Sequence, residues 1–431
     1  MELSSEQKIV FDKYLARENI FISGPAGVGK GKIIQEIYKH AIENKKRIQV
    51  CALTGCAALL LNCKAKTIHS WSGIGIANGY KEDIVERVAN NFQKSKNWKS
   101  VDILIIDEIS MMSLKIFEIL NEIAIKVKKR DKIFGGMQII LSGDFYQLPP
   151  VGNPLEIETT QFCFESPLWN QMFTKQNSIL LVKIFRQNDE KFLKILNEIR
   201  DGKMFRSSVN LLKERIGKKV ESHIQPTKLF PRRFQVDTYN KMEMDKLSGD
   251  DYLFCLSYEM EIPMKEKYSK DQIQRELETI ENSLISHKEL QLKVGSQVMY
   301  TINSETPQGF QLCNGSRGVV TSFNVSGFPI VKFQDGFEIP IEPHIWSSET
   351  IPGIGVKHLP LILAWGISIH KSQGMSIDCA EIDVGSDIFE CGQTYVALSR
   401  VKSLEGLYLT SLDISKIKMN SKVKDFYNQF K

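Results

Sequence analysis

A glycine-rich run that ends in lysine lies between an apolar strand pattern and a helical pattern. The run is Gly24-Pro25-Ala26-Gly27-Val28-Gly29-Lys30, and it follows Ile20-Phe21-Ile22. Glycines let backbone N–H groups turn towards an anion, and the lysine adds a positive charge. The helix that starts there presents its positive end to the same place. The pattern therefore predicts a loop that binds phosphate groups.

Gly31 departs from this pattern. A serine or threonine usually follows the lysine, and its hydroxyl holds Mg²⁺. Because Mg²⁺ usually keeps several water ligands, we expect nucleotide to bind despite the glycine, with weaker placement of the metal and slower hydrolysis. The sequence leaves open whether Gly31 is a natural variant or an introduced substitution.

A second apolar run leads into two acidic residues: Asp107-Glu108 follows Ile103-Leu104-Ile105-Ile106. An aspartate at a strand end can hold Mg²⁺ through water, and an adjacent glutamate can orient or deprotonate the attacking water. A lone Asp-Glu pair is usually a surface feature, but its place after a strand and downstream of the phosphate loop favours a catalytic role.

Gln147 lies in the segment Gly143–Pro150, which follows the apolar run 138–141. Its amide can both donate and accept, as sensing a γ-phosphate requires. Phe145 and Tyr146 offer flat rings on which bases could stack, and packing inside the loop is the alternative for one of them.

Arg186 and Arg400 are isolated arginines that follow the first α/β pattern of the chain. Phosphoryl transfer needs positive charge beyond the loop lysine, often from an arginine of another domain. Since an arginine forms a surface salt bridge far more often than it acts in catalysis, their positions alone do not assign this role.

The composition is that of an ordinary globular protein. The chain has 431 residues, 42% hydrophobic and 25% charged, with a net charge of +5. The mild positive charge is compatible with a polyanion partner and does not prove one. The N-terminal residues lack a secretory signal, there is no apolar run of ~18 residues, and the eight cysteines are scattered. We expect an intracellular, soluble protein with no membrane contact, its compartment left open.

Strand and helix patterns alternate over residues 1–183, which predicts a doubly wound α/β domain with a small polar lobe inserted at about 73–99. Residues 184–431 read as a second domain. It carries a polar, helical insertion at about 241–289 and, at about 290–343, short strands separated by turns that predict a small β barrel.

The motifs together resemble the Pif (petite integration frequency) family of superfamily 1B DNA helicases, and more distantly the bacterial RecD-like helicases. The resemblance runs from Ser4 to about Leu409. It rests on eight motifs in the family's order: Gly24–Lys30, Thr54-Gly55-Cys56-Ala57-Ala58, Thr67-Ile68-His69-Ser70, Asp107-Glu108-Ile109-Ser110-Met111, Gly143–Pro150, Phe185-Arg186-Gln187, His370-Lys371-Ser372-Gln373-Gly374 and Tyr395-Val396-Ala397-Leu398-Ser399-Arg400.

The resemblance implies an α/β fold of two RecA-like domains with ATP between them and a small SH3-like β barrel inserted in the second. Family members move 5′ to 3′ on single-stranded DNA and unwind duplexes or quadruplexes. We therefore expect ATP and Mg²⁺ as cofactors, and single-stranded and tailed duplex DNA as partners. We also expect a monomeric motor with roles in DNA replication, repair or recombination.

The resemblance also implies roles for individual residues. The expected catalytic residues are Lys30, Glu108, Gln147, Arg186 and Arg400, and Asp107 is the expected magnesium residue. The expected nucleotide-binding residues are Gln7, which would read adenine, and Gly24, Pro25, Ala26, Gly27, Val28, Gly29, Lys30, Gly31 and Gly374. The expected DNA-binding residues are Thr54, His69, His370 and Lys371 from the resemblance, and Phe145 from its flat ring. His69 and His370 have a structural role as their alternative.

The sequence thus favours an ATP-dependent 5′-to-3′ DNA helicase. A nucleotide-gated clamp on single-stranded DNA with impaired hydrolysis is the second hypothesis, because of Gly31. A small-molecule kinase or GTPase is the third. The paired arginines, the chain length and the missing guanine-recognition motif argue against it.

Overall fold

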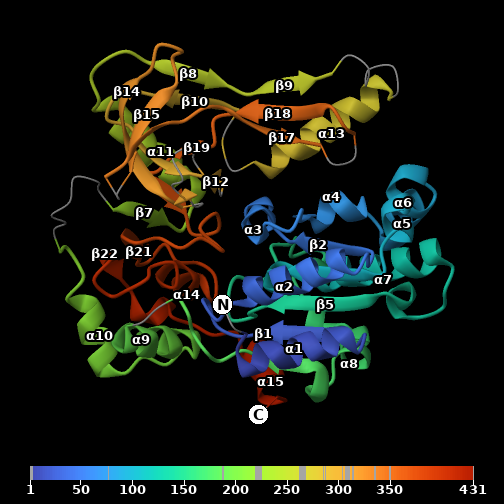
Figure 1. Ribbon diagram of the computed structural model, residues 1–431. Coiled ribbons are helices and arrows are strands. Elements are labelled where there is room, and N and C mark those ends of the chain that lie inside the picture. The colour runs from blue at the N-terminus through green and yellow to red at the C-terminus, as the bar shows by residue number, and fades with distance from the viewer. Residues whose placement is uncertain are drawn as a thin grey trace. The chain divides into compact units, whose positions relative to one another are not determined.

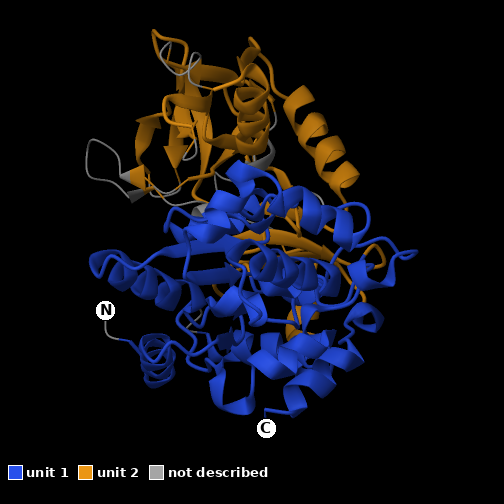
Figure 2. Ribbon diagram, turned by 90° about the vertical axis from the view of Figure 1, so that its right-hand side faces the viewer, with its two compact units in different colours: residues 1–208, 388–399, 414–431 blue, residues 209–387, 400–413 orange. Residues whose placement is uncertain are grey.

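The described residues of the computed structural model form two compact units. They are residues 3–75, 77–186, 189–218, 226–261, 268–284, 286, 288–302, 304–305, 311–312, 315–333, 336–348 and 351–430. Unit 1 comprises Met1–Ser208, Ile388–Ser399 and Ile414–Lys431, and unit 2 comprises Val209–Asp387 and Arg400–Asp413 (Figure 2). The domain boundaries expected from the sequence stay a prediction.

Unit 1 is built on one parallel sheet of six strands, in the order β3-β2-β4-β5-β1-β6 (Figure 1). The strands β1, β4 and β5 are buried along their whole length. This is why they read as continuous apolar runs in the sequence. The strands are β1 (Ile20–Ser23), β2 (Ile48–Ala52), β3 (Lys66–Thr67), β4 (Ile103–Asp107), β5 (Gln138–Gly143) and β6 (Ser178–Leu180).

Helices cover both faces of this sheet. Ile20 and Ile22 belong to the core beneath α1, α2 and α3, whereas Phe21 between them belongs to the core beneath α7, α8 and α15. The alternation follows from the two-residue period of a strand. The helices of unit 1 are α1 (Ser5–Leu15), α2 (Lys30–Glu43), α3 (Gly55–Leu61), α4 (Ile68–Ser72), α5 (Lys81–Ala89), α6 (Phe92–Lys99), α7 (Leu114–Lys128), α8 (Pro167–Met172), α9 (Glu190–Arg200), α14 (Gln393–Leu398) and α15 (Ser421–Asn428). The sequence division between the units, after Ser208, falls within α10 (Arg206–Lys213).

The lysine-rich stretch near residue 95 folds as α5 and α6. Trp98 of α6 is fully buried, its ring centroid lies 4.8 Å from that of Trp71, and its Nε1 donates to the Ser72 carbonyl. A tryptophan anchored in this way fixes α6 on the unit. Lys96 and Lys99 of α6 are exposed, and the half-buried Lys94 donates to the Gly73 carbonyl.

Unit 2 contains a second parallel sheet, in the order β20-β7-β21-β22, which confirms the α/β class with two parallel sheets. An antiparallel sheet in the order β16-β15-β14-β11-β19 contains the strands expected for the inserted barrel. The elements of unit 2 are β7 (Thr227–Phe230), α11 (Arg233–Asp245), β8 (Tyr252–Cys255), β9 (Ser257–Met260), α13 (Lys270–Ser283), β10 (Glu289–Leu292), β11 (Gln297–Tyr300), β12 (Ser304–Glu305), β13 (Gln311–Leu312), β14 (Arg317–Phe323), β15 (Pro329–Phe333), β16 (Glu338–Pro340), β17 (His344–Ser347), β18 (Ile354–His358), β19 (Leu361–Leu363), β20 (Gly366–Ser368), β21 (Ala380–Val384) and β22 (Leu407–Leu412).

The structure differs from the expectation of a helical insertion at 241–289. The segment does contain α13, but β8 and β9 precede it, paired with β10 and β18 respectively. Both strands are short and keep no face fully buried, so their sequences lack the apolar alternation that marks a strand. Their partners lie far along the chain, where a local pattern cannot reveal them.

Among the residues that the structure describes, no helix is both long enough and apolar enough to cross a membrane.

The helix α15 is expected to contribute substantially to the stability of unit 1. Phe426 is 5% exposed, and its ring centroid lies 4.3 Å from that of Phe164 and 5.7 Å from that of Trp169. Phe426→Ala should lower the free energy of unfolding by about 3 kcal/mol, measured by urea unfolding. Phe92→Ala, at a ring 79% exposed, is the matched control and should change it by less than about 0.5 kcal/mol. Equal losses in the two variants would show that α15 is not part of the core.

Candidate functional site

The predicted nucleotide residues of unit 1 follow neighbouring strands of its sheet. In the parallel pairing of β1 with β5, Ser23 lies opposite Gly143, so Gly24 and Asp144 leave the sheet side by side. The strand β4 pairs with the other edge of β5 and ends at Asp107. Because parallel strands present their carboxyl ends at one edge, the fold brings these three segments together.

The phosphate loop adopts a conformation that requires glycine. The φ angles of Gly24 and Gly29 are 145° and 80°. A Cβ at Gly24 would lie 2.3 Å from the Leu181 carbonyl oxygen, and one at Gly29 would lie 2.8 Å from Nε2 of Gln7. Side chains at these positions would be strained and would collide with their neighbours.

Lys30, the first residue of α2, folds back over the loop. Its Nζ donates to the carbonyl oxygens of Gly24 at 2.8 Å and Pro25 at 3.1 Å. Burial lowers the pKa of Lys30, and the negative charges of Asp144, Glu108 and Asp107 oppose this effect. The ammonium group therefore interacts electrostatically with the carboxylates of the neighbouring strand ends.

Gln7 is buried against the phosphate loop. It is 3% exposed, and its Nε2 donates to the Gly29 carbonyl at 3.2 Å. Its Oε1 accepts from the Ser4 backbone N–H, which completes a capping box at the start of α1. The structure thus places Gln7 at the loop, which favours a role there over that of an exposed terminal glutamine.

Asp107 ends β4 in a buried position. Burial, followed by the charge of Glu108, raises the pKa of Asp107 from 3.8 to about 6. Its Oδ1 is buried and finds no hydrogen-bond partner among the described residues. An orphaned carboxylate oxygen beside a phosphate loop fits a hydrated Mg²⁺, which prefers oxygen ligands.

Glu108 adopts the left-handed conformation, with φ 55° and ψ 40°. Such angles are uncommon for a residue with a side chain and cluster at functional sites. The 3₁₀ turn that follows, Ile109–Met111, approaches Gly143 so closely that a Cβ there would lie 2.9 Å from the Ile109 nitrogen. The close contact between this turn and the end of β5 therefore constrains the backbone next to Glu108.

Gly31 has room for a side chain. A Cβ at this position would meet Leu61 Cδ2 at 3.6 Å, an ordinary van der Waals distance. Packing in this structure therefore does not exclude a serine at position 31.

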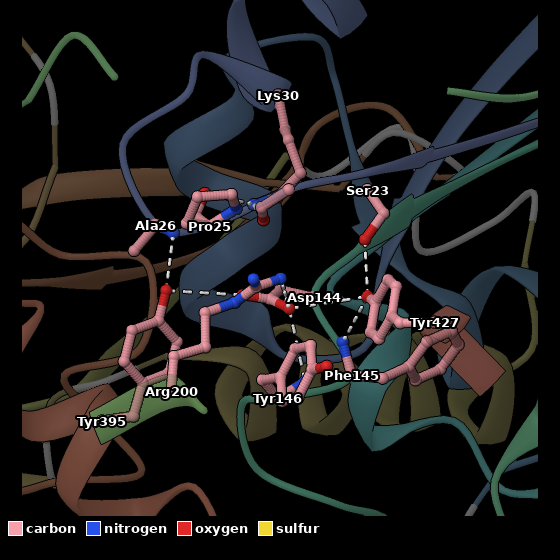
Figure 3. Close-up of polar contacts among 11 residues, drawn as sticks. Ser23, Pro25, Ala26, Lys30, Asp144, Phe145, Tyr146, Arg200, Tyr395 and Tyr427 are labelled. Carbon is pink, nitrogen blue, oxygen red and sulfur yellow. Dashed lines mark hydrogen bonds and ion pairs between the residues drawn. The ribbon is translucent and has the colours of Figure 1, made fainter. Parts of the chain in front are cut away.

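An ion pair with a fully buried carboxylate lies beside the phosphate loop, and sequence reasoning missed it. Arg200 of α9 forms two parallel hydrogen bonds with Asp144, at 3.1 Å from Nε to Oδ2 and 2.9 Å from Nη2 to Oδ1 (Figure 3). Burial opposes the charge of Arg200, but Asp144 outweighs it and raises the arginine pKa. The Tyr146 ring centroid lies 4.2 Å from the guanidinium carbon. Arg200 lies outside the eight motifs, and its only sequence signal is its place in the last turn of a helix.

Two tyrosines from later in the chain reach the same cluster (Figure 3). The hydroxyl of Tyr395 in α14 accepts from the Ala26 backbone N–H at 3.0 Å. The hydroxyl of Tyr427 in α15 bonds Ser23 Oγ at 2.5 Å. Tyr395 is part of a recognised motif, whereas no pattern marked Tyr427.

The loop after β5 buries two of its predicted residues. Gln147 is 4% exposed, and its N–H donates to the Asp144 carbonyl. Phe145 is 1% exposed and packs its ring against Phe21 and Phe426. This packing leaves Phe145 no free face for a base, so we remove it from the expected DNA contacts and assign it to the aromatic core.

Arg186 lies in unit 1 with the phosphate loop. Its Nη1 donates to the Ser399 carbonyl at 3.4 Å. Burial lowers the pKa of Arg186, and the charge of Glu108 opposes this effect. Phe185, just before it, donates its N–H to the Gly27 carbonyl. Gln187 of the same motif lies outside the described residues.

Thr54 and His69 follow the adjacent strands β2 and β3, which pair Ala52 with Thr67. Thr54 Oγ1 accepts from the Ala57 N–H at the start of α3. His69 lies on α4, where burial lowers its pKa and favours the neutral ring. Both therefore lie at the sheet edge that carries the phosphate loop, towards the β3 side.

The remaining predicted residues lie in unit 2. His370 and Lys371 follow β20, and the backbone of Gly374 is left-handed with φ 83°. Burial lowers the pKa of His370, and Lys371 is exposed. Arg400 is 1% exposed, with its Nη1 3.5 Å from the Met375 carbonyl oxygen that it bonds. These four residues thus belong to one unit, and their roles stay predictions.

Comparison with known proteins identifies the family. The model of the PIF1-like helicase family matches residues 2–210, and the model of the 2B domain of DNA helicase Pif1 matches residues 277–323. The crystal structure of the Pif1 helicase from Candida albicans has a TM-score of 0.79 and 32% identity, covering 100% of both chains. The chain belongs to the PIF1-like helicase family. Its two parallel sheets are RecA-like domains, and its antiparallel sheets match the 2B domain.

Two further proteins of the family are similar to this chain over nearly its whole length. The chain is 36% identical to the ATP-dependent DNA helicase PIF1 of Xenopus laevis over 434 residues, covering 100% of this chain and 64% of the relative. The chain therefore spans about two thirds of that protein. The structure of the Pif1 helicase from Bacteroides in complex with ADP-AlF3 and ssDNA has a TM-score of 0.68 and 26% identity, covering 100% of this chain and 97% of that one.

The buried carboxyl group of Asp107 should destabilise the fold in a pH-dependent way. Since its pKa is raised from 3.8 to about 6, ionisation costs stability. The cost is small below about pH 4, grows as the pH rises to about 6 and is complete above that value. In metal-free buffer, Asp107→Asn should therefore raise the free energy of unfolding by about 2–3 kcal/mol at pH 8 and by much less at pH 4, measured by urea unfolding.

Asp102, just before the same strand, is the control. A hydrogen bond from Arg47 lowers the pKa of its half-exposed carboxyl. Asp102→Asn should therefore give no gain at pH 8. A stability gain for Asp107→Asn that does not change with pH would contradict the raised pKa.

Proposed function

We propose that this chain is an ATP-dependent DNA helicase that moves 5′ to 3′ on single-stranded DNA and unwinds duplex DNA. The observation that carries the proposal is the convergence of Lys30, Asp107 and Glu108 at neighbouring strand ends of one sheet. Membership of the PIF1-like helicase family supports it. So does the Bacteroides relative, whose structure contains both a nucleotide analogue and ssDNA.

In this proposal the loop Gly24–Gly29 and Lys30 bind the phosphates of ATP, and Gln7 recognises adenine. Glu108 orients the attacking water and accepts its proton. Gln147 senses the γ-phosphate from the loop after β5. Arg186 and Arg400 supply positive charge for phosphoryl transfer, and Gly374 contributes to nucleotide binding.

Asp107 would hold Mg²⁺ through water, since its buried Oδ1 has no partner among the described residues. The ion would neutralise phosphate charge during hydrolysis. Because Gly31 offers no hydroxyl, water must replace that ligand, and we propose that hydrolysis is slowed for this reason.

For DNA, we propose that Thr54, His69, His370 and Lys371 contact the DNA strand. Hydroxyl, imidazole and ammonium groups bind phosphates without reading sequence, so binding should be tolerant of sequence and sensitive to salt. We further propose a monomeric motor that acts in DNA replication, repair or recombination.

A nucleotide-gated clamp is the second candidate, and Gly31 is the observation that favours it. In a clamp, ATP would bind and change the grip on DNA with little turnover.

Unwinding of two partial duplexes tests the proposal. The wild-type protein should separate a duplex with a 5′ single-stranded tail when ATP and Mg²⁺ are present and leave one with a 3′ tail intact. Lys30→Ala should abolish unwinding, because the phosphates lose their lysine. Separation of the 3′-tailed duplex would overturn the polarity. ATP-dependent DNA binding without turnover would favour the clamp.

Two substitutions at position 31 isolate the role of the missing hydroxyl. Gly31→Ser should raise DNA-stimulated ATP turnover by about tenfold, equivalent to ~1.4 kcal/mol in the transition state, because the serine restores a metal ligand. Gly31→Ala has no hydroxyl but removes the same backbone freedom, so it should leave turnover near the wild-type value. Equal rates for the serine and alanine variants would refute the assigned role of this position.

A further inference from the structure

A continuous path of hydrogen bonds connects the phosphate loop to α9 through α14. The Ala26 N–H donates to the Tyr395 hydroxyl at 3.0 Å, and that hydroxyl donates to Asp144 Oδ2 at 3.4 Å. Arg200 holds the same carboxylate with two hydrogen bonds. Figure 3 shows this path. It lies wholly within unit 1.

Because the path is buried, each of its polar groups depends on the next one for a hydrogen-bond partner. Ala26 is 8% exposed, Tyr395 2% and Asp144 0%. A buried backbone N–H needs an acceptor, and the hydroxyl oxygen of Tyr395 supplies one. The single hydroxyl proton is then directed to Asp144, whose charge is compensated by Arg200.

The neighbouring groups of the loop are already engaged. The carbonyls of Gly24 and Pro25 accept from Lys30, and Ser23, just before the loop, bonds Tyr427. With its first residues held in this way, the loop can present the N–H groups that follow Ala26 to the phosphates.

We propose that Tyr395 is a positioning residue for ATP, whose hydroxyl fixes the phosphate loop at Ala26 and which is itself held by Asp144 and Arg200. This inference rests on the proposed function and adds three residues to it, none of which is expected to touch the nucleotide. Ordering the loop favours binding of the phosphates in the substrate and in the transition state alike. Its loss should therefore raise KM and leave kcat nearly unchanged.

Tyr395→Phe removes the hydroxyl and keeps the ring. We expect KM for ATP in the DNA-stimulated ATPase reaction to rise about tenfold, because a buried N–H loses its acceptor. kcat should change by less than about twofold. The affinity for a fluorescent ADP analogue, measured without DNA, should fall by a similar factor.

Tyr14→Phe is the matched control. Tyr14 is also fully buried in unit 1, and its hydroxyl bonds His40 Nδ1 at 3.0 Å, away from the phosphate loop. This variant loses one buried tyrosine hydroxyl, as Tyr395→Phe does, and it should keep the wild-type KM.

A double-mutant cycle tests the link to Arg200. Arg200→Lys keeps the charge and loses the paired hydrogen bonds, so KM should rise in the same direction. In the Tyr395→Phe background it should raise KM no further, because Arg200 acts through the tyrosine. Independent structural damage would instead give additive effects.

The possible results separate the two proposals. An active wild-type enzyme with unchanged KM in Tyr395→Phe overturns the inference and leaves the proposed function intact. A lower KM in that variant also overturns it, since the hydroxyl would then obstruct the nucleotide. A wild-type protein that neither binds nor hydrolyses ATP overturns the proposed function itself.

Discussion

The parallel pairing of β1 with β5, and of β5 with β4, is the constraint on which the proposed nucleotide chemistry depends. This register releases Gly24 and Asp144 from opposite residues and brings the end of β4 to the same edge. Neither the loop glycines nor the carboxylates could act together from strands in another order. The buried faces of these strands hold the arrangement in place through two separate cores.

The site concentrates charge and strain that the surrounding fold must stabilise. Burial disfavours the charged forms of both Asp107 and Lys30. Glu108 adopts a left-handed backbone conformation. The ion pair of Asp144 with Arg200 adds a buried carboxylate and a partly buried guanidinium group, and it contributes specific geometry more than stability. A hydrated cation and a triphosphate would relieve several of these costs together, which is a physical reason for a nucleotide to order this region.

Much of this arrangement could be predicted from the sequence, because it depends on local patterns. Apolar runs followed by Gly24–Lys30 and by Asp107-Glu108 mark the strands and the residues at their ends, and the structure places both segments as expected. The path from Ala26 to Arg200 could not be predicted in the same way, since it joins segments that are distant along the chain. The ring of Phe145 was misjudged for a similar reason. Its neighbour Phe426 lies on α15, and no local signal links that helix to the loop after β5. The strands β8 and β9 were missed because their partners, too, are remote.

The hydroxyl of Tyr427 bonds Ser23 across 404 residues of sequence, and this distance has a consequence for synthesis on the ribosome. The strand that leads into the phosphate loop emerges early, whereas the helix that seals its aromatic core emerges long afterwards. Until then, Phe21 and its neighbours lack some of the apolar contacts of the folded protein. The nascent chain therefore exposes an aggregation-prone apolar surface while unit 2 is synthesised. Completion of the aromatic core on this face of the sheet therefore awaits synthesis of α15, and a chaperone that shields the face in the meantime would favour correct assembly.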